Sequence, residues 1–452
     1  MRKILVISYT FPPSGGVGSP VALAFLRHLP KTGNQVWVLT PRNPATPVQD
    51  PELAKLIPAD AQGNVFRSWT PEVPYRWRDK IWKRFDPPHR VGKSEAEQRP
   101  QGLLGKVKSA ARAQLQHFLF PDPQVVWTGS AIRRASRLIP QLGIDSVFFN
   151  APPFSLLKIA IELKRRFPHV NIYTHLRDDW VGYYMGRFDS PSPEKIAQTR
   201  AMERAAVEAS TMVSIASPVW AEGLRHRYPD QSPQKFFCMT NGYEPEAFAG
   251  FPSPVRRAEK LSVSYFGTVY QNPIYSPLPF FNAVEALPPQ QRDRVQARFM
   301  GRVQDEAKPL FEHRSFDVQA LGFMPKLKGI QMLKEADLLL VIANGPESHA
   351  GKLFDYLATG KPILALTYPD GAMARLIRET RTGWAIDAND SRAIQAVLLD
   401  CIEAVREGRP LTNPNWQEIR KYSWPEIIAD WARTTSGVEQ DSAPELAYPS
   451  SH

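Results

Sequence analysis

Short apolar runs alternate with segments of helical periodicity from the start of the chain. Ile4–Ile7 is the first such run, and the apolar residues between 21 and 29 follow it at close to helical spacing. Further runs predicted as strands are 35–40, 145–150, 171–175 and 211–216, with helical patterns at 154–166 and 193–208. Apolar strands joined by helices predict a parallel sheet with helices on both faces.

The same alternation repeats after residue 260. The predicted strands are 261–266, 298–300, 337–343, 362–366 and 383–386, and the predicted helices lie near 277–287, 326–335, 349–359, 371–379 and 390–405. The chain is therefore predicted to be an α/β protein with two doubly wound halves. Ligands of such sheets bind at the carboxyl ends of the strands, so a shared ligand is expected in a cleft between the halves.

These patterns set the expected domain boundaries. An N-terminal domain is predicted at 1–245 and a C-terminal domain at 246–418, because a segment rich in proline and charge separates them. Ser423 is a suitable N-cap for a final helix at 419–435, and the apolar residues 424, 427, 428 and 431 follow at helical spacing. Residues 436–452 lack periodicity and are predicted to be a disordered tail.

Composition narrows the class of protein. The 452 residues are 43% hydrophobic, which excludes global disorder, and 56 Lys and Arg against 45 Asp and Glu give a net charge of +11. Two cysteines, Cys238 and Cys401, are too few for a disulfide scaffold and favour a reducing, cytoplasmic location. No run of 18 apolar residues occurs, so no transmembrane helix is expected.

A long insertion at about 41–128 interrupts the first half and carries most of the charge. Its segment 67–112 holds twelve Lys and Arg against five Asp and Glu, a net +7, with Trp69, Trp77 and Trp82 interleaved. Basic residues with amphipathic aromatics suit an anionic membrane surface. The alternative is a solvated insertion whose aromatics pack on the core. No nucleic-acid-binding motif accompanies the charge, so nucleic acid is not an expected partner.

The segment 344–365 has the most specific pattern. A loop with Glu347 follows a predicted strand and leads into a predicted helix with Asp355, which Gly360 ends. Amides of Ser348, His349 and Ala350 at that helix N-terminus would form an anion site. Lys352 would add a point charge toward a phosphate. Asp355 could accept hydrogen bonds from two neighbouring hydroxyls, as on a ribose; the alternative is a solvated helix carboxylate.

With this pattern the chain resembles the nucleotide-sugar glycosyltransferases of the GT-B fold, close to retaining glycosyltransferase family 4. The family signature is two acids eight residues apart, then small residues and a Gly-x-Pro turn, which Glu347, Asp355 and Gly360-Lys361-Pro362 match with Asp in the second place. Further stretches resemble the family in order along residues 1–435: 11–16, 120–122, 151–155, 177–180 and 241–243. The resemblance also implies that the final helix, 419–435, crosses back to the N-terminal domain.

The resemblance implies roles for particular residues. Glu347 and His175 would be catalytic, with Glu347 holding donor-sugar hydroxyls and His175 facing the reacting sugar. Donor contacts would come from Gly15, Gly16, Arg177, Ser348, His349, Lys352, Asp355 and, after the first strand of the second half, Gly267 and Thr268. For His175 the alternative is a strand-end histidine bonded to backbone, and for Gly15-Gly16 it is a plain tight turn. A Rossmann dinucleotide site is disfavoured because Gly-x-Gly-x-x-Gly is absent.

One departure from the family stands out. Members usually carry Arg and Lys after Gly267 to hold the pyrophosphate, but Thr268 occupies the first place and no Lys follows. Lys352 is expected to substitute; the alternatives are that Arg302 or Arg177 reaches across, or that activity is impaired. No Asp-x-Asp occurs, so Asp178 and Asp179 are not expected to bind a metal.

The resemblance therefore implies a metal-independent glycosyltransferase without a cofactor. It would move a sugar from a nucleoside-diphosphate donor to a sugar or lipid-linked acceptor in surface polysaccharide or glycolipid assembly, with retention. It would be cytoplasmic and peripheral at the inner face of the membrane. The alternatives are a GT-B nucleotide-sugar epimerase and a catalytically silent GT-B binding protein. The donor base, the sugar, the acceptor and the oligomeric state are not fixed by the sequence.

Overall fold

The computed structural model describes residues 1–16, 18–46, 49–72, 118–184, 192–249, 258–271, 275–343, 345–347 and 349–441. The chain divides into two compact units, which are described separately. The first unit is Met1–Ile215 with Arg225–Phe237, and the second is Ala216–Leu224 with Cys238–His452. The division falls at 237/238, eight residues before the boundary predicted at 245/246. Most of the basic segment 67–112 lies outside the described residues.

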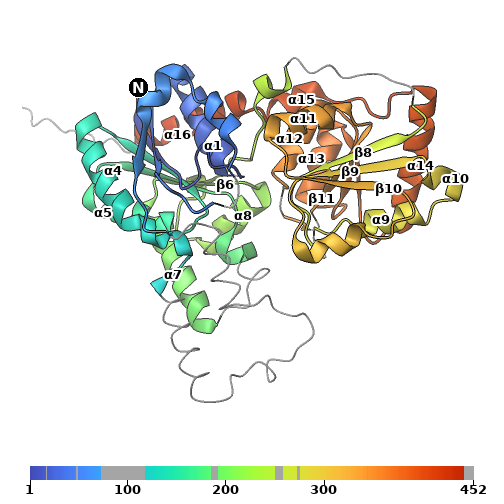
Figure 1. The fold of residues 1–452 in the computed structure, drawn as a ribbon. Coiled ribbons are helices and arrows are strands. Elements are labelled where there is room, and N and C mark those ends of the chain that lie inside the picture. The colour runs from blue at the N-terminus through green and yellow to red at the C-terminus, as the bar shows by residue number, and fades with distance from the viewer. Residues whose placement is uncertain are drawn as a thin grey trace, which may run out of the picture. The chain divides into compact units, whose positions relative to one another are not determined.

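The first unit is built on a seven-stranded sheet (Figure 1). Its order is β3-β2-β1-β4-β5-β6-β7, and the pairs from β3 through β6 are parallel. The strands are β1 Lys3–Ile7, β2 Gln35–Pro41, β3 Val65–Ser68, β4 Ser146–Ala151, β5 Asn171–Leu176, β6 Met212–Ile215 and β7 Phe236–Cys238. Its helices are α1 Gly18–His28, α4 Thr128–Leu142, α5 Leu156–Arg166 and α7 Pro193–Ala209, with a π-helix at Trp180–Tyr184. Helix α8, Pro218–Arg227, is divided between the units: its residues up to Leu224 belong to the second unit and Arg225–Arg227 to the first.

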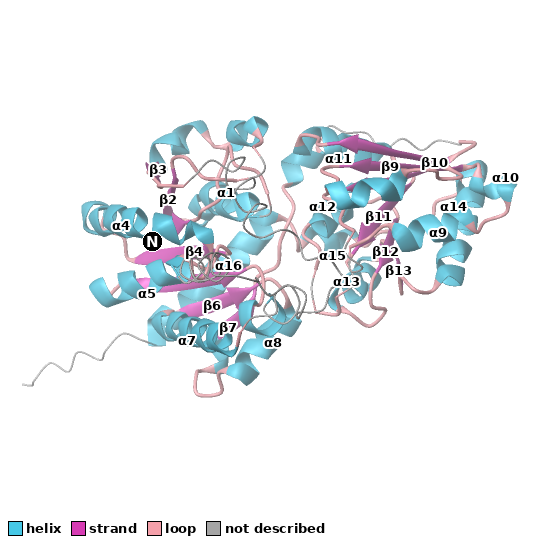
Figure 2. Cartoon of the chain, turned by 60° about the horizontal axis from the view of Figure 1, so that its bottom comes forward, coloured by secondary structure: helices cyan, strands magenta, loops and turns pink. Residues whose placement is uncertain are grey.

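The second unit has a six-stranded, fully parallel sheet in the order β10-β9-β8-β11-β12-β13. The strands are β8 Leu261–Phe266, β9 Val295–Met300, β10 Asp317–Gly322, β11 Leu338–Ile342, β12 Ile363–Leu366 and β13 Gly383–Ile386. The helices are α9 Leu278–Glu285, α10 Pro289–Arg292, α11 Lys326–Glu335, α12 Lys352–Thr359, α13 Ala372–Thr380, α14 Ser391–Glu407, α15 Trp416–Arg420 and α16 Trp424–Asp441. In Figure 2 the magenta strands of each unit lie among cyan helices.

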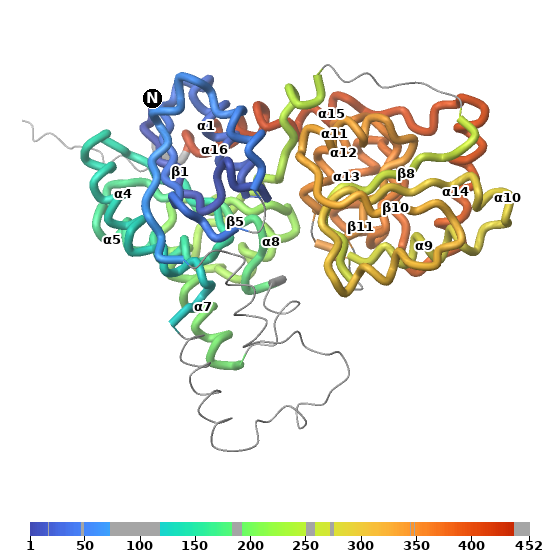
Figure 3. The backbone as a smooth tube through the Cα atoms, in the orientation of Figure 1, coloured from blue at the N-terminus to red at the C-terminus, as the bar shows by residue number. Residues whose placement is uncertain are grey.

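Both sheets reverse their winding next to their first strand. In the second unit the chain moves outward from β8 through β9 and β10 and then returns to place β11 on the other side of β8. Figure 3 traces the backbone of the chain, with β8, β10 and β11 labelled. In the first unit β1 has β2 on one side and β4 on the other. Such switch points open a crevice at the carboxyl ends of the strands, where ligands of this fold class bind. The two doubly wound halves predicted from the sequence are confirmed.

Buried apolar side chains cover both faces of the second sheet. Phe280, Phe281 and Phe299 belong to the cluster under α9 and α14, and Leu339 and Phe354 belong to the cluster under α11, α12 and α13. Strands that are buried on both faces need continuous apolar runs, which is why Leu338–Ile342 is apolar throughout. The rigid scaffold fixes the loops at the carboxyl ends.

The final helix α16 extends to Asp441, beyond the end predicted at 435. The first part of the predicted disordered tail, 436–441, is therefore helical, and 442–452 lie outside the described residues. Trp424, Ile428 and Trp431 are at most 2% exposed, as their helical spacing predicted. Gly242 lies against the start of α16, because a Cβ there would meet Ile427 and the Tyr422 carbonyl. That this helix returns to the N-terminal domain stays a prediction.

None of the helices in the described ranges combines the length and the apolar character that a membrane span requires.

Candidate functional site

Glycines form the carboxyl edge of the second sheet beside its switch point. Gly267 follows β8 and Gly301 follows β9, both at positive φ (+153° and +130°). A Cβ on Gly301 would lie 2.3 Å from the Gly267 carbonyl oxygen, and a Cβ on Gly267 would lie 2.6 Å from Lys352 Nζ. Side chains are thus excluded at both positions by backbone conformation and by space.

The amine of Lys352 lies at this carboxyl edge of the second sheet. Its Nζ donates to the Tyr265 hydroxyl at 2.5 Å and lies 3.8 Å from the centre of the Tyr265 ring. The Tyr265 hydroxyl in turn donates to the Thr268 carbonyl oxygen at 2.9 Å. Among the described residues no carboxylate forms an ion pair with Lys352. Burial without a counter-charge lowers the pKa of Lys352 to about 7.

Asp355 lies one turn further along α12. Its Oδ2 forms an ion pair with Lys326 Nζ at 3.1 Å, and its Oδ1 is buried without a hydrogen-bond partner. Lys326 is the first residue of α11, so the pair joins the N-terminal turns of two helices. Nothing in the sequence pointed to Lys326, because 29 residues separate it from Asp355. A carboxylate held from one side with one oxygen unsatisfied can accept a hydroxyl donor.

The loop before α12 differs from its prediction. The helix begins at Lys352 rather than near 349, so the amides of His349 and Ala350 precede the helix and do not form its first turn. Ser348 lies outside the described residues. Burial lowers the pKa of His349, and nearby Arg375 lowers it further. The Glu347 backbone carbonyl accepts a hydrogen bond from the Ser217 hydroxyl at 2.5 Å.

In the first unit, the glycine loop after β1 leads into α1. Gly16 has φ +98° with open space where a Cβ would stand, whereas Gly15 is buried. Gly18 is the crowded position: a Cβ there would lie 2.3 Å from Thr10 Oγ1 and 3.1 Å from the Arg177 guanidinium carbon. The sequence indicated donor contacts for Gly15 and Gly16 but none for Gly18. The role of Gly18 depends on Arg177, which only the folded chain places against it.

Three stretches that resemble the family in the sequence contact one another at the ends of β4 and β5. Asp122 Oδ2 accepts the Ser155 backbone N–H at 2.9 Å, which ties 120–122 to the residues before α5. Trp180 stacks on Phe154 with ring centres 4.5 Å apart and lies 6.3 Å from Phe120. These three stretches, which are separate in the sequence, therefore pack together as one structural unit.

His175 is the most deeply buried of the predicted catalytic residues. It is 1% exposed, stacks on Phe148, and its Nδ1 lies 3.0 Å from Ser214 Oγ. Burial, then the positive charge of Arg177, lowers its pKa to about 3, so the imidazole is neutral at physiological pH. Its Nε2 is buried without a hydrogen-bond partner.

Asp178 and Asp179 have different environments. Asp179 is 4% exposed and pairs with Arg227, with Asp179 Oδ2 2.7 Å from Arg227 Nη2. Arg227 also pairs with Glu203, which is 1% exposed, at 2.6 Å. Asp178 forms no ion pair with any residue in the described ranges, and burial raises its pKa. Within the described residues no three His, Cys, Asp or Glu side chains cluster as a metal site.

The predicted residues thus fall into two sets, each within one unit. The second unit brings together Gly267, Thr268, Lys352 and Asp355, with Glu347 and His349 on the preceding loop. The first unit brings Arg177 to the N-terminus of α1, two residues after Gly16, and places His175 below it.

Solved structures share this fold at low sequence identity. Anabaena HepE in complex with UDP matches at 15% identity with a TM-score of 0.57, covering 97% of this chain and 100% of that one. HepE with UDP-glucose gives a TM-score of 0.59 at 15% identity over 97% of this chain and 100% of that one. A glycosyltransferase from Rickettsia africae matches at 11% identity and a TM-score of 0.53, covering 98% and 99%.

No protein-family model matches the sequence, and no curated protein matches it. At these identities the structural matches establish the fold and do not establish the reaction. Two parallel α/β units with seven and six strands, matching solved glycosyltransferase structures along nearly the whole chain, identify this protein as one with the GT-B fold.

Proposed function

We propose that this protein transfers a sugar from a nucleoside-diphosphate donor to an acceptor, with retention and without a metal. The observation that carries the proposal is the Lys352 amine beside Gly267, at the switch point of a fold whose solved examples include UDP and UDP-glucose complexes. A diphosphate needs a cation and a backbone without side chains where it binds, and this edge offers both.

Each residue of the site suits a different part of the reaction. Lys352 would neutralise the charge that develops on the departing diphosphate, the role that a metal fills in other transferases. Asp355 would accept ribose hydroxyls, and Glu347 would hold hydroxyls of the donor sugar. The working mechanism is a front-side displacement in which the leaving phosphate takes the acceptor proton. His175, neutral at physiological pH, is suited to a hydrogen bond with the substrate rather than to carrying charge.

The direct test is turnover. Purified protein is incubated with a panel of nucleotide sugars, with and without candidate acceptors, and free nucleoside diphosphate is measured. A transferase releases nucleotide in step with a glycosylated product. An epimerase releases it without an acceptor, and a silent binding protein, which Thr268 favours, binds without release. If no nucleotide sugar binds by calorimetry, the proposal is wrong.

Asp355→Ala is expected to weaken UDP binding by roughly 10- to 100-fold, because it loses two hydroxyl contacts that contribute about 1 kcal/mol each, or somewhat more for a charged acceptor. Calorimetry of the folded variant measures this. Asp400→Ala is the matched control, since Asp400 is another ion-paired aspartate of the second unit but is half exposed and bonded to Arg409. Equal affinities for the two variants would remove Asp355 from the nucleotide site.

Chelation is expected to leave the rate unchanged. If Lys352 stabilises the leaving group, EDTA should alter turnover by less than about twofold, a barrier change of under about 0.5 kcal/mol. The rate is compared before and after dialysis against chelator and after Mg²⁺ or Mn²⁺ is restored. Loss of activity that Mn²⁺ reverses would show that a metal does the work assigned to Lys352.

We also propose that the segment 67–112 brings the enzyme to an anionic membrane, where a lipid-linked acceptor of surface polysaccharide or glycolipid assembly would lie on the cytoplasmic side. Each cation near such a surface contributes about 1 kcal/mol. Co-sedimentation with vesicles should require anionic lipid and weaken with salt. Protein that stays in the supernatant at low salt would favour a solvated insertion and a soluble acceptor.

A further inference from the structure

The first unit holds a cation where its fold already places positive potential. The Arg177 guanidinium lies against the N-terminus of α1, since a Cβ on Gly18 would stand 3.1 Å from both its Cζ and its Nη2. The amino end of a helix carries about half a positive charge. In the described part of the chain no carboxylate forms an ion pair with Arg177; Asp178 acts on it only at longer range. Two like charges are therefore held together without a counter-ion.

Arg177 also keeps part of its hydrogen-bonding capacity unused. Its Nη2 donates to the Pro152 carbonyl oxygen, which fixes the orientation of the guanidinium. Its Nε is buried and has no acceptor among the residues that the structure describes. A buried guanidinium nitrogen without a partner is costly, so such an atom in a native fold indicates a missing acceptor.

Two more unsatisfied atoms lie on the neighbouring strands. Asn150 and His175 are register partners on β4 and β5, so their side chains leave the same face of the sheet. Asn150 Nδ2 donates to the Gly18 carbonyl at 2.8 Å, which puts this face under the N-terminus of α1. Asn150 Oδ1 and His175 Nε2 have no partner, although both residues are 1% exposed.

This cluster stands at the switch point of the first sheet, where β1 and β4 diverge in winding. Its cationic side suits a phosphoryl group, because helix N-termini and guanidinium forks are the two protein groups that recognise it best. Pro20 has no N–H, so the first turn of α1 supplies fewer donors and leaves more of the task to Arg177. Its neutral side, Asn150 and His175, suits a hydroxyl.

We propose that the first unit binds a phosphorylated acceptor, with the phosphate contacting both Arg177 and the adjacent N-terminus of α1 and a neighbouring hydroxyl on Asn150 and His175. This rests on the proposed transferase function, because the second unit has its own cation, Lys352, for the donor diphosphate. In this proposal Arg177 contacts the acceptor, whereas the family resemblance implies that it contacts the donor.

The test uses the full chain saturated with UDP, so that the donor site is filled. Thermal unfolding is followed with inorganic phosphate, with α-D-glucose 1-phosphate and with glucose, at an ionic strength held constant by chloride. Phosphate should raise the unfolding midpoint of the UDP-bound protein, and the hexose phosphate should raise it more than glucose and phosphate together. Each variant is compared with itself without phosphate, so a lower starting stability does not hide the effect.

Arg177→Gln should weaken phosphate binding at least tenfold, and Arg177→Lys should fall between it and the wild type because the charge remains while the fork is lost. If Arg177→Gln does not fold, the phosphate response of Arg177→Lys is compared with that of the wild type instead. Arg204→Gln is the matched control, an arginine of the same unit whose ion pair with Asp230 is about half exposed; it should keep the full phosphate response.

Three results would overturn the inference. Phosphate that displaces UDP one for one would assign the anion to the donor. A wild-type protein without a phosphate-dependent shift would show that no such site exists, and an unchanged shift in Arg177→Gln would place it elsewhere. Binding of UDP is measured in the same protein by calorimetry, so failure of this inference is distinguishable from failure of the proposed function.

Discussion

Lys352→Met is expected to weaken UDP binding by about 100-fold and to stabilise the protein without ligand. The charge-assisted contact with the diphosphate disappears, and such contacts contribute about 1.5–3 kcal/mol each. In the free protein the amine is held without a carboxylate, against the Tyr265 ring. Methionine fills a similar volume without charge, and the Tyr265 hydroxyl keeps its bond to the Thr268 carbonyl.

The pH dependence follows from the lowered pKa of Lys352. The amine titrates near pH 7 in the fold and near 10.4 in the unfolded chain. Below pH 7 both states are charged and the fold carries the desolvation penalty; as pH rises from 7 toward 10.4 the folded amine is neutral and the penalty is relieved. The wild type should therefore gain stability relative to Lys352→Met across this window. At pH 7 the variant should be more stable by at least about 1 kcal/mol, roughly 2–4 °C.

Nucleotide binding should show the opposite trend. The diphosphate selects the charged amine, so wild-type affinity for UDP should fall above pH 7, by up to about tenfold per pH unit. Measurements from pH 7.5 to 9.5 avoid the ionisation of the phosphate itself, which ends near pH 6.

Two variants make the measurement specific. Lys352→Met should bind UDP weakly with no such slope. The control Lys328→Met removes an exposed lysine from α11 of the same unit and should behave like the wild type. A Lys352→Met protein that binds UDP as tightly as the control would exclude Lys352 from the diphosphate site.

The architecture could be predicted because buried parallel strands leave a clear signal. Runs such as Leu338–Ile342 are apolar throughout, and they are the strands found. Three strands escaped prediction: Val65–Ser68, Phe236–Cys238 and Asp317–Gly322. All three, β3, β7 and β10, lie at sheet edges, and β10 has a polar and partly exposed pattern. Edge strands bury less surface, so their sequences are less constrained toward apolar residues.

The site was predictable only where its residues share a motif. Lys352 and Asp355 are three residues apart on one helix, and Gly267 ends a clear strand. Lys326 and Gly18 depend on long-range approach: an ion pair to Asp355 across two helices, and a guanidinium 159 residues away in sequence. The start of α12 was misplaced for a local reason, since Pro346 and Gly351 favour a loop that periodicity alone does not register.

Arg227→Met is expected to destabilise the first unit by about 3–5 kcal/mol. Asp179 and Glu203 are at most 4% exposed, and Arg227 is the cation between them, with hydrogen bonds of 2.6–2.9 Å to both. Removing one partner of a buried ion pair leaves uncompensated charge, which costs far more than the pair itself contributes. Here two carboxylates lose their partner at once. Urea unfolding followed by tryptophan fluorescence measures the change.

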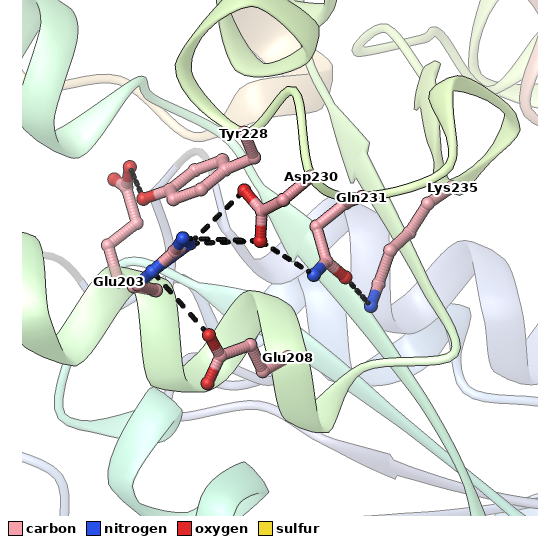
Figure 4. Close-up of polar contacts among 7 residues, drawn as sticks. Glu203, Glu208, Tyr228, Asp230, Gln231 and Lys235 are labelled. Atoms are coloured by element: carbon pink, nitrogen blue, oxygen red, sulfur yellow. Dashed lines mark hydrogen bonds and ion pairs between the residues drawn. The ribbon is translucent and has the colours of Figure 1, made fainter.

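Arg204→Met is the matched control. Arg204 pairs with Asp230 and Glu208, and the side chains of all three are about half exposed. Both carboxylates are labelled in Figure 4. Exposed pairs contribute about 0–1 kcal/mol, so this variant should lie within that range of the wild type. Both substitutions are arginine to methionine on adjacent helices, so the difference between them isolates burial. Similar losses in the two variants would mean that Arg227 acts through packing rather than charge.

Acidification should separate charge from packing in the same variant. In the wild type, burial already raises the pKa of Glu203 against the opposing effect of Arg227. Without Arg227 the pKa of Glu203 rises further, so the folded variant binds a proton that its unfolded chain, with ordinary carboxyl pKa values near 4, releases. Stability of Arg227→Met should therefore increase as pH falls from 7 toward 5, while the wild type changes less. The triple variant Asp179→Asn, Glu203→Gln, Arg227→Met should recover most of the loss at pH 7, because neutral groups replace the stranded charges. A variant whose deficit is the same at pH 5 and pH 7, and which the triple replacement does not repair, would contradict an electrostatic origin.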